Sequence, residues 1–81
     1  MRSNEYFIVF PEGDIQEVPL RLSIGELVDI NGRPLELPLP SIRTIAFRVA
    51  RIQTKEERNA TELYHHLELM SAEELRAYAR R

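Results

Sequence analysis

Residues 42–70 read IRTIAFRVARIQT-KEER-NATELYHHLELM and form the longest regular pattern in the chain. Apolar and polar residues alternate along much of its first arm, 42–54, and of its second arm, 59–70. A period of two is typical of β-strands with one buried face. We therefore predict a long β-hairpin connected by residues 55–58. A helix over 55–70 is the competing prediction, because Lys-Glu-Glu-Arg is also a good helical tetrad.

Two registers of this hairpin compete, and they differ in the residues that share a face. Pairing Thr54 with Asn59 places Arg48 opposite His65, which brings charge into an apolar face. We prefer the register that is slipped by one residue, because one face then becomes almost wholly apolar. It requires a three- or five-residue loop and a bulge. Its pairs are Ile45 with Leu67, Phe47 with His65, Val49 with Leu63 and Arg48 with Tyr64.

Shorter strand patterns precede the hairpin. We expect strands at residues 5–10, 15–24, 26–31 and 33–37. Pro19 cannot donate a backbone hydrogen bond, so its strand belongs at a sheet edge or a bulge. Asn31 and Gly32 suit a two-residue turn in which both residues have positive φ, and this turn places Val28 opposite Leu35.

The chain closes with a predicted helix over residues 72–80. Ser71 suits the N-cap, Glu74 completes a capping box, and Met70 can pack on Leu75 as a hydrophobic staple. A helix of about ten residues is not stable alone in water, so it must dock on the sheet. The predicted fold class is mainly β. We expect a small five-stranded antiparallel, strongly bent sheet or an SH3-like or OB-like barrel, with one C-terminal helix.

Length and composition indicate a single small soluble domain. The chain has 81 residues, of which 43% are hydrophobic and 30% charged, as in ordinary globular domains. Charges interrupt every apolar segment, so we expect neither a membrane span nor a signal peptide. The cytoplasm is the expected compartment.

The residues that could carry out catalysis are sparse. The chain has no cysteine, and its three glycines are isolated, which excludes thiolate chemistry and a glycine-rich phosphate loop. His65 and His66 are neighbours on a strand and point to opposite faces, so they cannot easily bind one metal ion. We expect His65 in the core and His66 on the solvent face. The sequence therefore predicts a protein that is not an enzyme and has no catalytic residues, cofactor, metal site or small-molecule substrate.

The charge distribution suggests where a partner could bind. The net charge is −2, yet residues 41–58 carry five cations against two acids, a net +3. In our preferred register the outer face of the 42–70 hairpin carries the candidate binding surface, formed by Arg48, Arg51, Tyr64 and His66. We expect the chain to bind another protein or a second copy of itself, since sheet edges and an exposed helix side invite both. The alternative is weak binding of single-stranded RNA, because an Arg beside an aromatic ring can contact phosphate and stack on bases.

Overall fold

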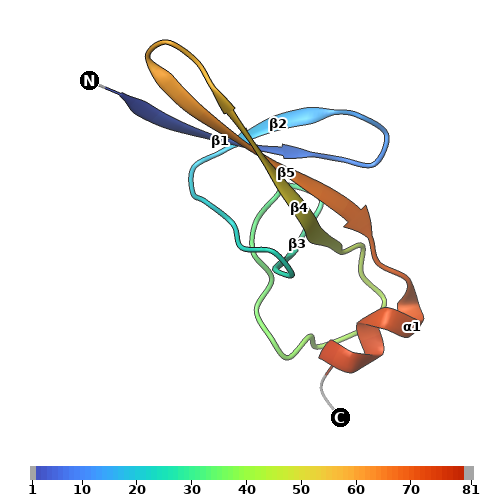
Figure 1. The fold of residues 1–81 in the computed structure, drawn as a ribbon. Helices are drawn as coiled ribbons and strands as arrows, with labels where there is room; N and C mark the ends of the chain where they lie inside the picture. The colour runs from blue at the N-terminus through green and yellow to red at the C-terminus, as the bar shows by residue number, and fades with distance from the viewer. Residues whose placement is uncertain (1, 80–81) are drawn as a thin grey trace.

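Strand β5 (Ala60–Leu69) lies at the centre of a curled sheet because it pairs with two long neighbours (Figure 1). The computed structural model describes residues 2–79, and over this range five strands form one sheet in the order β2-β1-β5-β4-β3. The sheet curls into a half-barrel, so the predicted mainly β, strongly bent fold with a C-terminal helix is confirmed. The other elements are β1 (Ser3–Val9), β2 (Ile15–Val18), β3 (Leu27–Val28), β4 (Phe47–Glu56), the helix α1 (Ala72–Leu75) and the 3-10 turn η1 (Arg76–Tyr78).

One strand pair departs from the predicted antiparallel sheet. β1 runs parallel to β5, with Phe7 beside Tyr64 and Val9 beside His66, so the sheet is mixed. Parallel neighbours need a long connection. Here most of the chain lies between β1 and β5, and no turn signal reveals such a pairing.

The hairpin exists, but its predicted register is wrong. Arg48 lies opposite Glu68 rather than Tyr64, and Phe47 lies opposite Leu69. The register shifts between Val49 and Arg51, so the predicted bulge is present: an extra residue at position 50 lets both ends of the hairpin pair. The predicted three- or five-residue loop is not formed. Glu56 pairs with Thr61 and Glu57 N–H donates to the Ala60 carbonyl, so only residues 58 and 59 lie between paired positions. The strand also begins later than residue 42, which leaves Ile45 exposed rather than in the core.

The inner face of the half-barrel holds the core. Ile8 from β1, Val49 from β4 and Leu67 from β5 are buried together with residues from β2 and β3. His65 is fully buried among them, as predicted, whereas His66 is only half-buried. A second cluster lies where the helix docks, and it consists of Leu27, Leu39, Ala46, Met70 and Leu75.

The turn at Asn31–Gly32 differs from the predicted two-residue turn. Gly32 has a φ of 79°, but no described non-glycine residue has positive φ, Asn31 included. Asp29 donates its N–H to the Arg33 carbonyl, and its side chain accepts hydrogen bonds from Asn31 N–H and Arg33 N–H. The loop is therefore one residue longer than predicted, and Val28 pairs with Pro34 rather than Leu35.

The predicted short strands shrink for identifiable reasons. β2 is an edge strand and ends at Val18, directly before Pro19, as the missing N–H of proline requires. Of the predicted strands at 26–31 and 33–37, only β3 and the bridge at Pro34 remain.

The C-terminal helix begins as predicted and ends earlier. Ser71 Oγ accepts from Glu74 N–H at 3.1 Å, and Glu74 Oε1 accepts from Ser71 N–H at 3.0 Å, which completes the capping box. After Leu75 the helix tightens into η1, so the predicted helix over 72–80 is one α-turn and one 3-10 turn. Arg80 lies outside the described residues. Leu39 then pairs with Ala79, which fixes the end of the helix against the loop before β4.

Candidate binding surfaces

The outer face of the sheet brings together the four residues that the sequence singles out. In an unbroken strand Arg48 and Arg51 would point to opposite faces. The bulge at position 50 reverses the alternation, so Val49 and Ile52 face the core while both arginines face outward. Arg51 lies opposite His66, and Tyr64 is two residues away on the same face. The predicted face is thus assembled, although by a register that the sequence did not indicate.

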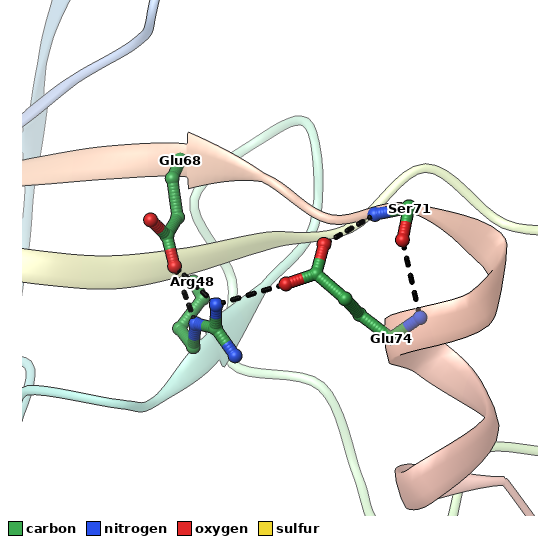
Figure 2. Close-up of polar contacts among 4 residues, drawn as sticks. All are labelled: Arg48, Glu68, Ser71 and Glu74. Carbon is green, nitrogen blue, oxygen red and sulfur yellow. Dashed lines mark hydrogen bonds and ion pairs between the residues drawn. The ribbon is translucent and has the colours of Figure 1, made fainter.

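Arg48 is already occupied by carboxylates (Figure 2). Its Nε donates to Glu68 Oε1 at 2.6 Å, and its terminal nitrogen donates to Glu74 Oε2 at 3.1 Å. The hydrogen bond to Glu68 raises the pKa of Arg48 above its already high ordinary value. Because Glu74 also closes the capping box, Arg48 ties the start of α1 to β4 and β5. Its role is structural, and it does not present a free cation to a partner.

The other three predicted residues, His66, Tyr64 and Arg51, differ in charge and in whether they form ion pairs. Burial, with a contribution from the charge of Arg51, lowers the pKa of His66 below 6.5, so this ring is uncharged at neutral pH. Burial and a hydrogen bond to Glu62 raise the pKa of Tyr64 above 10, so its phenol is neutral too. Within residues 2–79, Arg51 takes part in no ion pair. It is therefore the free cation of the predicted set.

Phe7 is a member of this face that sequence reasoning missed. Its ring stacks on that of Tyr64 with centroids 5.0 Å apart and an interplanar angle of 15°. The contact follows from the parallel pairing of β1 and β5, which no local pattern shows. We define the outer face by the residues Phe7, Arg48, Arg51, Tyr64 and His66.

A second surface, which the sequence did not reveal, lies along the edge strand β2. Two hollows meet at Gln16, and we call them together the edge groove. The larger hollow has a volume of about 530 Å³ and is lined by residues 16–22, Glu26 and residues 31–34. The smaller has a volume of about 390 Å³ and is lined by Phe10, Glu12, residues 14–16, Ile30 and Phe47. Gln16 spans the groove by donating a hydrogen bond to the Asn31 carbonyl at 3.0 Å.

The edge groove has an apolar rim that solvent reaches. Leu20 is 70% exposed, Ile15 58% and Ile30 57%, although leucine and isoleucine are usually buried. Beneath them Phe10 and Phe47 pack edge to face with centroids 5.2 Å apart. The alternation of residues 15–24 marked Ile15 and Leu20 as apolar positions of a strand. It could not show that the half-barrel stays open beside β2, because that depends on how far the sheet curls.

Neither surface contains the elements of a metal site. Among residues 2–79, no three His, Asp or Glu side chains come close enough together to hold a metal ion. The same part of the chain contains no helix with the length and apolar character that crossing a bilayer requires.

Comparison with known proteins places the chain in a family. The family described as "Uncharacterised Treponema protein" matches residues 2–78, which is nearly the whole chain, so the chain belongs to this family. No curated protein and no solved structure matches it. Inferences about its function therefore rest on the two surfaces.

Proposed function

We propose that this protein is a non-enzymatic module that binds another protein through the edge groove. The observation that carries the proposal is the rim of exposed Ile15, Leu20 and Ile30 above the two hollows. Exposed apolar side chains gathered at a concave surface are typical of protein-binding sites, whereas isolated ones are ordinary. The proposed compartment is the cytoplasm, which cell fractionation would test.

The experiment compares two matched variants. Leu20→Asp places a charge in the edge groove, whereas Leu37→Asp changes a side chain that is 54% exposed and lines neither hollow. Proteins cross-linked to the wild type in cells are identified by mass spectrometry, purified and titrated against all three forms. We expect Leu20→Asp to weaken binding at least tenfold and Leu37→Asp to leave it unchanged. Equal binding by all three forms, or the absence of any cross-linked protein, would contradict the proposal.

Sedimentation at several concentrations distinguishes a second copy from a different protein. If the partner is another copy of the chain, the sedimentation coefficient of the wild type rises with protein concentration. The coefficient of Leu20→Asp then stays at the value of the monomer. A strictly monomeric wild type leaves a heterologous partner.

The outer face supports a second candidate function, the binding of single-stranded nucleic acid. The specific observation is the Phe7–Tyr64 stack on the face that also carries Arg51, a cation with no ion pair among residues 2–79. Aromatic rings and Arg contact bases and phosphates. The neutral His66 and the occupied Arg48 limit its positive charge, so this candidate ranks second. Titration of labelled single-stranded RNA at several salt concentrations tests it. Binding that weakens steeply with salt, with a slope reduced in Arg51→Ala, supports this function, and no binding at low salt removes it.

A further inference from the structure

The backbone of β2 has hydrogen-bonding groups that no neighbour uses. Phe10 N–H donates to the Asp14 carbonyl, so alternation turns the backbone groups of Gln16 and Val18 toward β1 and those of Ile15 and Glu17 away from it. Within residues 2–79, no other segment donates to or accepts from the backbone of Ile15 or Glu17. This edge can therefore receive one more strand, as exposed sheet edges do in peptide-binding domains.

The two hollows follow one another along β2, so an added strand can reach both. They share Gln16 as a wall, so they are adjacent along the direction of β2. Side chains two residues apart on a strand point the same way and lie about 7 Å apart. A strand beside β2 can place one apolar side chain in each hollow. A helix can fill hollows too, but it cannot use the free backbone groups of Ile15 and Glu17.

The charges of the groove give the added strand a polarity. Glu12 and Asp14 line the smaller hollow, no cation lines it, and neither carboxylate belongs to an ion pair among the described residues. In the larger hollow the two cations Arg21 and Arg33 balance the two acids Glu17 and Glu26. A complementary partner is basic at the smaller hollow and neutral at the larger one.

We propose that the partner binds as an extended peptide that adds to the free edge of β2, with alternate apolar side chains in the two hollows and a basic residue beside Glu12 and Asp14. This inference rests on the proposed protein-binding function of the edge groove and names the kind of partner that the groove takes.

The test uses a phage-displayed library of random octapeptides selected on the whole chain. We expect the enriched peptides to carry apolar residues at every second position and Lys or Arg at one end. The variant with both Glu12→Lys and Asp14→Lys should select acidic residues at that end instead. Glu36→Lys, an exposed substitution outside both hollows, is the matched control and should keep the wild-type preference. No enrichment, apolar residues spaced three or four apart, or an unchanged preference in the double variant would overturn the proposal.

Hydrogen exchange with one enriched peptide, made synthetically, locates its contact. We expect the Glu17 amide to exchange at least tenfold more slowly in the complex, and the amides of the outer face to be unchanged. Protection confined to the outer face would overturn the proposal, as would displacement of the peptide from that face by single-stranded RNA. If Leu20→Asp loses its cellular partner while the selected peptides have helical spacing, the protein-binding function stands and the strand addition fails. If Leu20→Asp keeps its cellular partner and the double variant keeps the wild-type peptide preference, both the protein-binding function and the strand addition fail.

Discussion

His65 is the buried polar residue on which two distant segments depend. Its Nδ1 donates to the Phe7 carbonyl at 2.8 Å, and its Nε2 accepts from Leu22 N–H at 3.1 Å, so the ring is the neutral Nδ1–H tautomer. Leu22 belongs to the loop after β2 and Phe7 to β1. One imidazole therefore ties the irregular segment to the centre of the sheet.

Replacing this ring should be costly. His65→Phe keeps an aromatic ring but leaves the buried Leu22 N–H without its acceptor, and an unsatisfied buried group costs about 1–3 kcal/mol. We expect a loss of about 1–3 kcal/mol in the free energy of unfolding, measured by urea denaturation. His66→Phe is the control, because that ring lies on the outer face. Equal losses in the two variants would show that the hydrogen bonds of His65 are not the cause.

Gly32 allows the loop before β4 to approach the core closely. A Cβ at this position would lie 2.6 Å from Ile8 Cδ1 and 3.2 Å from Val18 Cγ1. At Gly13, which also has positive φ, a Cβ would meet nothing within 4 Å. A substitution at Gly13 therefore incurs only the cost of the backbone conformation, whereas one at Gly32 also incurs the cost of crowding.

The pair Gly32→Ala and Gly13→Ala tests this difference. Positive φ costs an alanine about 1–2 kcal/mol at either position, and overpacking adds about 1–3 kcal/mol at Gly32. Thermal and urea denaturation should therefore show the larger loss for Gly32→Ala. If Gly13→Ala is as destabilising, the close approach to Ile8 carries no cost.

At the scale of elements, the carboxylate of Glu74 joins the helix to the sheet. It accepts from Ser71 N–H and from Arg48, which itself binds Glu68 on β5. Hydrogen bonds from Ser71, with help from Arg48, lower the pKa of Glu74 below 4.5. The docking of α1 should therefore depend on pH.

The sign of this dependence follows from the lowered pKa. The ionised carboxylate favours the folded state, so its contribution is complete above pH 4.5 and is lost as the pH falls through the folded-state pKa. Glu74→Gln keeps a capping-box residue but cannot ionise. We expect the free energy of unfolding to fall less steeply for Glu74→Gln than for the wild type between about pH 5 and pH 3. Parallel curves for the two proteins would contradict the prediction.

At the scale of the whole molecule, some strands of the half-barrel are paired on both sides and others on one side only. The molecule measures 48 × 23 × 17 Å, and the loop of the β4–β5 hairpin lies far from α1 (Figure 1). On β4, β3 pairs with Phe47 and Arg48 alone, so within residues 2–79 no strand pairs with the outer edge of β4 beyond the bulge. Strand β5, in contrast, is paired on both sides.

Hydrogen exchange should follow this asymmetry. Glu57 N–H bonds to the Ala60 carbonyl, so alternation turns the amides of Ile52 and Thr54 toward the free edge. We expect these amides to exchange by local opening, roughly a hundredfold or more faster than that of the central His65, which should require global unfolding. Native-state exchange at increasing denaturant concentrations measures both. Equal rates would show that the molecule opens only as one unit.

Local signals in the sequence determined the elements that depend on neighbouring residues. The alternation of 42–54 and 59–70 predicts the hairpin, Pro19 predicts an edge strand, and Ser71 with Glu74 predicts the helix start. The mainly β class follows from the same signals. They succeed because period-two burial, a missing N–H and a capping box each act within a few residues.

The register, the parallel strand pair and the binding surfaces depend on contacts between distant segments, which local patterns do not show. The bulge at position 50 places Arg51 beside Arg48 on the outer face, and the pairing of β1 with β5 adds Phe7. The edge groove exists because β2 is the last strand at one side of the sheet, and among the described residues no strand pairs with its outer edge. Each of these features depends on packing between segments that are far apart in the chain. Alternative pairings satisfy the same alternating pattern, and only the fit of the whole core selects one of them.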